Sequence, residues 1–272
     1  RFQQAALDAA GIALRYEALD VAPAQFAERL LQLAAEGAAG NVTVPHKQAA
    51  LDACDVLTPL AAQVGAVNTF WTDAEGRLHG DNTDVGGFVA AVRAMLGRDL
   101  AGLQVALIGV GGAALAVRAA VEAAPGARLL VLARRAQAAR EFAAPMGERA
   151  RVVELTQAAR SVGGAAADDS AAALEALRAN LADVDLVVNA TPLGLEADDP
   201  FPLPPELLPA KAAVLDLTYR REGTTAWVAA CRTRGLVADD GLRMLVEQGA
   251  LAFERWFERP APRAMMLAAV GR

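Results

Sequence analysis

A glycine-rich turn near the middle of the chain has the residue types of an anion site. Its sequence is G-V-G-G-A-A at Gly109–Ala114, after the apolar run Gln104–Ile108 and before the alanine-rich run Ala113–Ala124. A strand that runs through such a turn into a helix presents unpaired backbone N–H groups at the positive end of the helix dipole. We therefore expect a dinucleotide pyrophosphate to be bound by four residues of this turn: Gly109, Gly111, Gly112 and Ala113.

The turn lacks the last glycine of the usual fingerprint, and an ordinary tight turn is the alternative. The end of the next apolar run, Arg128–Ala133, is more informative because Arg134 and Arg135 follow it. An acidic residue at this place accepts hydrogen bonds from the ribose of NAD, whereas a 2′-phosphate needs cations. The arginine pair predicts NADP as the cofactor; a solvated basic patch at a helix start is the competing interpretation.

Three polar clusters stand out in the first third of the chain: N-V-T-V-P-H-K at Asn41–Lys47, G-A-V-N-T at Gly65–Thr69 and G-D-N-T-D at Gly80–Asp84. Each lies near the end of an expected strand. Side chains at strand ends can converge on a ligand while the backbone hydrogen bonds of the sheet stay intact. These clusters are therefore candidates for a small polar ligand.

The elements that must position these residues follow from the periodicity of apolar residues. In the first part we expect helices at 1–10, 23–35 and 84–96, and strands at 14–19, 40–44, 66–72 and 77–79. In the second part we expect strands at 104–108, 128–133, 151–155, 185–190 and 213–217, a surface loop at 161–170, and an amphipathic helix at 242–257.

Alternating strands and helices predict an α/β protein with a parallel sheet in its nucleotide-binding part. We expect an α/β substrate-binding domain over residues 1–84, to which 240–272 return, and a Rossmann-type NADP-binding domain over 85–239, with the reacting groups between them.

Bulk composition narrows the class of partner. The net charge of −6 argues against nucleic acid as a partner, since binding its phosphates requires a basic surface. No stretch reaches the roughly 20 apolar residues that span a bilayer, so we expect no membrane partner.

Cys54 and Cys231 are too few for a disulfide framework and lack the spacing of a metal site. We expect a cytoplasmic protein that needs no metal.

The polar clusters, in their order and spacing, resemble the shikimate dehydrogenase family, which includes shikimate and quinate dehydrogenases. The resemblance continues through N-A-T-P-L-G at Asn189–Gly194, D-L-T-Y at Asp216–Tyr219 and G-L-R-M-L-V-E-Q-G at Gly241–Gly249. It covers nearly the whole chain. Several motifs in one order are far more specific than a glycine turn alone.

The resemblance implies that Lys47 and Asp84 are the catalytic pair. Reduction of a ketone by hydride builds negative charge on oxygen, so a nearby cation can stabilise that oxygen and supply its proton, while a carboxylate orients the cation. A solvated lysine at a helix start and an aspartate that caps a helix are the alternatives.

It also implies two groups of binding residues. Those expected to bind the hydroxyls or carboxylate of a cyclohexene acid are Asn41, Thr43, Asn68, Tyr219 and Gln248. Thr191 and Met244 are expected beside the nicotinamide. Caps for backbone groups are the alternative for the asparagines and threonines, and a core position is the alternative for Met244.

Three features depart from the family pattern. The paired serines that hold the substrate carboxylate near the start of the chain have no counterpart after Arg1. Either a preceding segment is missing or carboxylate recognition is altered, and the helix-like opening favours a missing segment. Arg221 replaces a common proline, and Arg243 replaces a small residue before Met244.

The resemblance predicts NADPH-dependent reduction of 3-dehydroshikimate to shikimate in the biosynthesis of chorismate, by a monomer or homodimer. The alternatives are oxidation of quinate or shikimate with NAD or NADP, and a sensor that retains the fold without catalysis.

Overall fold

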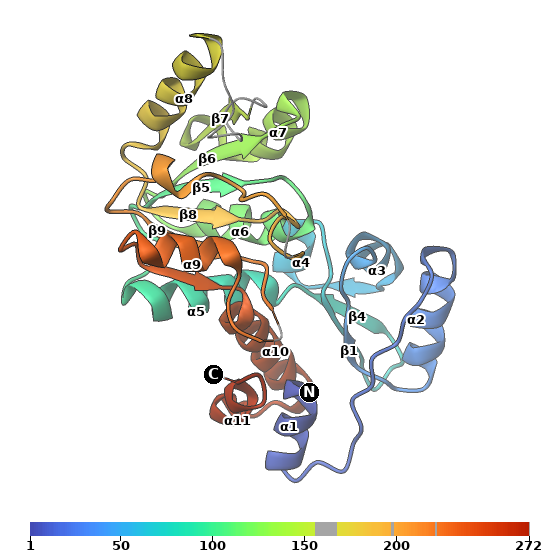
Figure 1. Cartoon of the computed structure of the whole chain (residues 1–272). Helices are drawn as coiled ribbons and strands as arrows, with labels where there is room; N and C mark the ends of the chain where they lie inside the picture. Colours follow the sequence, from blue (N-terminus) through green and yellow to red (C-terminus); the bar gives the residue numbers. More distant parts are fainter. Residues whose placement is uncertain (156–167, 197–198, 221, 272) are drawn as a thin grey trace. The chain divides into compact units, whose positions relative to one another are not determined.

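The computed structural model describes residues 1–155, 168–196, 199–220 and 222–271. These residues form an α/β protein with two compact units, 1–91 with 243–272, and 92–242 (Figure 1). The boundaries lie within helix α5 (Asp84–Leu96) and at the start of α10 (Leu242–Phe257), a few residues after the expected ones. The predicted fold class is confirmed. Among the described residues, no helix combines the length and the apolar character needed to cross a membrane.

The second unit, 92–242, is built on a parallel sheet of six strands in the order β10-β9-β8-β5-β6-β7. The strands are β5 (Gln104–Ile108), β6 (Arg128–Ala133), β7 (Ala150–Glu154), β8 (Leu186–Asn189), β9 (Ala213–Asp216) and β10 (Ala238–Asp240). The chain runs outward from β5 to β7 and then returns to β8 on the other side of β5. In such sheets, ligands bind at the carboxyl ends of the strands where this reversal occurs. Here that position is the ends of β5 and β8.

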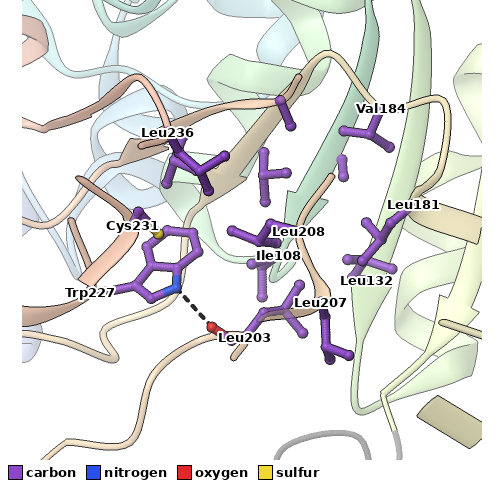
Figure 2. Close-up of a cluster of buried hydrophobic side chains, with 14 of the residues drawn as sticks. Ile108, Leu132, Leu181, Val184, Leu203, Leu207, Leu208, Trp227, Cys231 and Leu236 are labelled. Carbon is purple, nitrogen blue, oxygen red and sulfur yellow. Dashed lines mark hydrogen bonds between the residues drawn. The ribbon is translucent and has the colours of Figure 1, made fainter. Parts of the chain in front are cut away.

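Helices cover this sheet because its strands are apolar on both faces, as parallel strands require. They are α6 (Gly112–Ala123), α7 (Ala136–Ala143), α8 (Asp168–Leu181) and α9 (Ala226–Thr233), with short 3₁₀ turns at Ala144–Arg149 and Pro205–Leu207. On one face, Ile108 and Leu132 pack with Leu181 of α8 and Trp227 of α9 (Figure 2). The Trp227 Nε1–H donates to the carbonyl of Leu203 at 2.8 Å, so this buried ring is also satisfied.

The first unit contains a mixed sheet of four short strands in the order β1-β3-β4-β2. The strands are β1 (Gly40–Asn41), β2 (Val56–Leu57), β3 (Thr69–Thr72) and β4 (Leu78–Asp81). Helices α2 (Phe26–Ala35), α3 (Lys47–Ala53) and α4 (Pro59–Val64) accompany it, and a 3₁₀ turn at Pro23–Gln25 precedes α2. Phe26 and Leu30 of α2 pack with Phe70 and Leu78 of the sheet, which closes a small core.

A second core of this unit joins the two ends of the chain. Helices α1 (Phe2–Ala9) and α11 (Arg263–Ala268) contact each other, and both pack on α10 (Figure 1). Leu7, Phe253 and Met266 are at its centre. The expected amphipathic helix over 242–257 thus has the predicted bounds.

Two of the expected elements differ from those of the structure, and a third lies largely outside the described residues. The strand expected at 14–19 is wrong, because the segment pairs with no strand of the described chain, and Leu14 and Leu19 are exposed. Residues 42–44 do not extend β1 as expected. The loop expected at 161–170 lies outside the described residues up to 167, and α8 already begins at Asp168.

Candidate active site

Lys47 and Asp84 form an ion pair in the first unit. The Lys47 Nζ donates to the Asp84 Oδ2 at 2.5 Å, and the two side chains are only 16% and 10% exposed. Each residue begins a helix, Lys47 at α3 and Asp84 at α5. A helix start favours the carboxylate and disfavours the ammonium, so the pair offsets the unfavourable position of Lys47. The structure therefore brings the two expected catalytic residues together.

Asn68 fixes the orientation of this pair. Its Nδ2 donates to the Asp84 Oδ1 at 2.8 Å and to the Gln248 Oε1 at 3.2 Å, while its Oδ1 accepts from the Thr83 backbone N at 2.8 Å. The side chains of Asn68 and Gln248 are buried. Since both Asp84 oxygens are held, the carboxylate has one orientation toward Lys47.

Two glycines near the start of α5 allow α10, which carries Gln248, to approach closely. A Cβ at Gly87 would lie 2.9 Å from the Gln248 backbone N and 3.0 Å from the Met244 carbonyl O. A Cβ at Gly86 would lie 2.5 Å from Leu251 Cδ1. Backbone atoms cannot yield as a flexible side chain can, so Gly87 is needed for the close approach of the two helices.

Asn41 belongs to a hydrogen-bonded chain beside this cluster. Its Oδ1 accepts from the Tyr16 hydroxyl at 3.0 Å and from Gln3 Nε2 at 3.3 Å, and its Nδ2 donates to Thr69 Oγ1 at 3.0 Å. A further bond from Nδ2 reaches the Asn68 carbonyl O at 3.4 Å. An amide has two donors and one oxygen with two lone pairs, so these contacts use all of its capacity. Burial raises the pKa of Tyr16, which keeps its hydroxyl a donor.

The other expected substrate residues are placed differently. Thr43 is exposed and lies outside this chain of hydrogen bonds. Tyr219 belongs to the second unit, where it follows β9 and is 40% exposed. Met244 is buried on α10. Arg243 pairs with Glu247 one turn along the same helix, with 3.8 Å between Nη1 and Oε1, and Arg221 lies outside the described residues.

The Lys47 cluster can supply a proton to an oxygen. Within the described part of the chain, Asp84 is the one hydrogen-bond partner of Nζ, which leaves two of the three ammonium donors for a ligand. A carboxylate on one side of the ammonium and open donors on the other is the arrangement that stabilises an oxygen as it gains negative charge.

In the second unit the glycine turn joins β5 to α6, as predicted. Gly109 has φ +98°, and a Cβ there would lie 2.8 Å from Thr191 Cγ2, so this position requires glycine for backbone and packing reasons. Gly111 and Gly112 are exposed, and a Cβ at either would meet no protein atom within 4 Å. The protein's own packing therefore does not explain these two glycines.

Arg134 and Arg135 follow β6 directly and precede α7. Both are exposed, and in the described chain neither guanidinium pairs with a carboxylate. Cations at the start of a helix are unfavourable by themselves. Their placement is consistent with an anionic partner that is not part of the chain.

A buried network links the ends of β8 and β9. Asp216 Oδ1 accepts from Asn189 Nδ2 at 2.8 Å and from Thr218 Oγ1 at 2.8 Å, and Oδ2 accepts from Thr225 Oγ1 at 2.7 Å. Asn189 Oδ1 in turn accepts from the backbone N of Thr191 at 3.0 Å and from its Oγ1 at 2.7 Å. Burial raises the pKa of Asp216, and the hydrogen bonds from Thr225, Thr218 and Asn189 oppose that shift.

Family models match both ends of the chain, as the shikimate dehydrogenase substrate binding domain over residues 1–70 and the shikimate 5'-dehydrogenase C-terminal domain over 241–270. Shikimate dehydrogenase (NADP(+)) of Methylobacterium radiotolerans is 41% identical, over 93% of this chain and 84% of the relative. The chain belongs to the shikimate dehydrogenase family. The family predicted from the motifs is thereby confirmed.

Two further members of the shikimate dehydrogenase family are similar over almost the same length. Shikimate dehydrogenase (NADP(+)) of Symbiobacterium thermophilum is 40% identical, over 96% of this chain and 85% of the relative. The crystal structure of shikimate 5-dehydrogenase from Thermus thermophilus, in complex with NADP(H) and shikimate, is 34% identical and has a TM-score of 0.82. The match covers 99% of this chain and 92% of that one. The likeness thus extends through both units.

The sequence did not predict several residues of this shikimate dehydrogenase family member that form hydrogen bonds to the expected site residues. Asn189 and Asp216 belong to the motifs N-A-T-P-L-G and D-L-T-Y, which predict no role for them, and their side chains meet only because β8 and β9 are paired with Asn189 opposite Asp216. Tyr16 and Gln3 contact Asn41 from segments that carried no motif. The recurrence of polar residues at strand ends was the one signal available for the first pair.

Proposed function

We propose that this protein reduces 3-dehydroshikimate to shikimate with NADPH, in the biosynthesis of chorismate. The observation that carries the proposal is the Lys47–Asp84 pair at 2.5 Å, held by Asn68, in a member of this enzyme family. The pair has the groups that reduction of a ketone requires and leaves ammonium donors open toward a ligand.

The proposed cofactor fits the second unit. Because a Cβ at Gly111 or Gly112 would meet no protein atom within 4 Å, a pyrophosphate would have room at the start of α6, and the exposed Arg134 and Arg135 would supply cations for a 2′-phosphate. When bound, NADPH supplies the hydride. We propose that Gly109, Ala113 and Thr191 complete this site, with Gly109 allowing the turn; the role expected of Met244 stays a prediction.

Lys47 is the proposed proton donor. As hydride adds to the carbonyl carbon, the electron pair of the C=O π bond moves to oxygen, and that oxygen takes a proton from Lys47 Nζ. Asp84 keeps the ammonium pointed at the oxygen through its hydrogen bond to Nζ. Solvent then returns a proton to Nζ, so each turnover consumes one proton along with the hydride.

The proposed substrate residues differ in how many hydrogen-bonding groups remain available for a ligand. Gln248 Nε2 bonds the Leu245 carbonyl at 2.8 Å and keeps one N–H for a ligand, and the exposed Thr43 hydroxyl is open. The amide capacity of Asn41 is used within the chain, so we assign it to holding its neighbours. Asn68 has a similar holding role through Asp84, and direct contact by Tyr219 stays a prediction.

Replacement of Lys47 by alanine tests the proposal. The absorbance of NADPH, followed as 3-dehydroshikimate is added, should show a kcat lower by about 10²–10⁴-fold, the range for loss of a general acid. The Kd for NADPH should stay within about twofold. Lys211→Ala is the matched control, because Lys211 is the other lysine of the chain and is exposed before β9. Unchanged turnover in Lys47→Ala would reject the assignment.

The competing functions separate in the same assay. Wild-type kinetics with NADPH and NADH, and with shikimate and quinate, distinguish a biosynthetic reductase from a catabolic dehydrogenase. A protein that binds NADP and cyclic hydroxy acids without turnover would instead be a sensor.

We also propose a cytoplasmic location and a monomeric or homodimeric state. The thiols of Cys54 and Cys231 are free, and they would stay so in a reducing compartment. Sedimentation equilibrium of the purified chain distinguishes one copy from two.

A further inference from the structure

We propose that Asp216 is a positioning residue for the cofactor site, which acts through Asn189 to hold the Thr191–Gly194 loop against the glycine turn. The inference rests on the proposed function, since it assigns NADP to that turn. It adds a residue that lies below the site and does not itself touch the ligand.

Asp216 is a fully buried carboxylate whose oxygens are occupied. Oδ1 accepts from Asn189 Nδ2, Thr218 Oγ1 and the Thr218 backbone N, and Oδ2 accepts from Thr225 Oγ1. All of these groups are donors, which is the set that an ionised acceptor requires. Burying a charge is costly unless such bonds compensate it. Packing alone would be served as well or better by an apolar side chain, so we attribute the carboxylate to the orientation of the groups that it binds.

Asn189 passes this constraint to the loop. Because its Nδ2 is held by Asp216, its Oδ1 must point the other way, where it accepts from both the backbone N and the Oγ1 of Thr191. The same Nδ2 donates to the Leu193 carbonyl at 3.0 Å, and Thr191 Oγ1 accepts from the Leu193 backbone N at 3.3 Å. The amide therefore fixes both the entry and the exit of the loop.

The loop then meets the glycine turn directly. Thr191 Cγ2 and the Ala190 carbonyl occupy the space where a Cβ of Gly109 would lie, at 2.8 and 3.2 Å. Gly109 follows β5 and Asn189 ends β8, and these two strands are neighbours at the reversal of the sheet. Asp216, Asn189, Thr191 and Gly109 thus form one continuous series of contacts across three adjacent strands.

Isothermal titration of the full chain with NADP+ tests the proposal. Asp216→Ala should raise the Kd for NADP+ by about tenfold, as expected for loss of hydrogen bonds to a charged group. The Kd for shikimate should change by less than twofold. Asp216→Asn keeps an oxygen that can accept from Asn189, so it should restore most of the affinity. Thr225→Val removes the Oδ2 bond, together with the bond that Thr225 Oγ1 accepts from the Val228 backbone N at the start of α9, but it leaves the Asn189 bond and should change the Kd less than Asp216→Ala.

A double-variant cycle separates positioning from general damage. If Asp216 acts through Asn189, then Asn189→Ala should match Asp216→Ala, and the double variant should be no weaker than either. Leu181→Ala is the control for lost stability, because Leu181 is fully buried on α8 in the core of the same unit and makes none of these contacts. It should lower the Tm and leave the Kd for NADP+ unchanged.

Three results would overturn the proposal: a Kd for Asp216→Ala within twofold of wild type, effects that multiply in the double variant, or an equal weakening by Leu181→Ala. A wild-type chain that does not bind NADP+ would instead refute the proposed function itself. The two failures are therefore distinguishable.

Discussion

The Lys47 cluster and the glycine turn satisfy their polar groups in opposite ways. In the first unit, Lys47, Asp84, Asn68 and Gln248 are largely buried and bond one another. In the second, Gly111, Gly112 and the arginine pair at 134–135 are exposed, and the protein's own side chains do not compensate the two guanidiniums. The difference fits the two proposed tasks: one region would hold reacting groups in a fixed geometry, and the other would leave groups available for an anion.

The comparison also shows where substitutions are felt. A change in the buried cluster removes a hydrogen-bond partner from a buried polar group, so it should affect both the proposed chemical step and the stability. A change at the exposed positions of the turn, Gly111 and Gly112, should alter only what binds there.

Asp84→Asn should lower kcat by about 10²-fold, because the neutral amide no longer stabilises the ammonium form of Lys47. The KM for NADPH should stay within about twofold. Steady-state kinetics measure both. Asp52→Asn is the control, since Asp52 is an exposed carboxylate on α3 that bonds only Gln48 among the described residues. A kcat within threefold of wild type would remove Asp84 from the catalytic pair.

Replacement of both Arg134 and Arg135 by alanine should raise the KM for NADPH by about 10–100-fold, as charge-assisted hydrogen bonds to the 2′-phosphate are lost. Activity with NADH should not fall, because NADH lacks that phosphate. Arg140→Ala, at an exposed position of α7, provides the control. An unchanged KM for NADPH would favour the solvated basic patch, and equal losses with both cofactors would show a role that does not depend on the 2′-phosphate.

Substitutions of the glycines separate a ligand site from an ordinary turn. Gly109→Ala should destabilise the fold by about 1–3 kcal/mol, since it combines a positive φ with the contact to Thr191. Gly111→Ala and Gly112→Ala should leave the Tm within about 1 °C and weaken NADP+ binding. Thermal scans with and without NADP+ show both effects. If the last two variants bind NADP+ like the wild type, the open space is not the pyrophosphate site.

Tyr16→Phe should have the smallest effect. It removes one hydrogen bond to Asn41 Oδ1 and keeps the ring, so the free energy of unfolding should fall by about 0.5–1.5 kcal/mol. The KM for shikimate should rise no more than severalfold if Asn41 only holds its neighbours. A rise of about 10²-fold in the KM for shikimate, as large as the fall in kcat expected for Asp84→Asn, would show that Asn41 contacts the substrate.

The sequence predicted best those elements whose signal lies within their own residues. The strands Gln104–Ile108 and Arg128–Ala133 and the helices Asp84–Leu96 and Leu242–Phe257 have the predicted bounds, because their apolar periodicity is uninterrupted. The segment 14–19 has a similar pattern but pairs with no strand of the described chain, and a strand needs a partner. Short elements such as α3, α4 and β10 carry too few residues for a periodic signal.

The site residues show the same contrast between local sequence patterns and contacts between distant parts of the chain. The motifs identified Lys47 and Asp84, and the structure adds that they meet. The partners that hold the site come from elsewhere in the chain: Gln248 reaches Asn68 across 180 residues, and Asn189 reaches Asp216 through strand pairing. Such contacts depend on sheet order and helix approach, which one-dimensional patterns do not contain.

The glycine pair that opens α5 has a consequence for attempts to make this enzyme more heat-resistant. Helix propensity alone would recommend alanine at both Gly86 and Gly87, with a nominal gain of up to about 1 kcal/mol each. At Gly87 the added methyl group would meet the backbone of α10 and displace the turn that carries Gln248. Alanine at Gly87 should therefore lower the thermal tolerance that helix propensity promises to raise, and it should also displace the side chain proposed to bind substrate, so a stabilisation screen should leave this position as glycine.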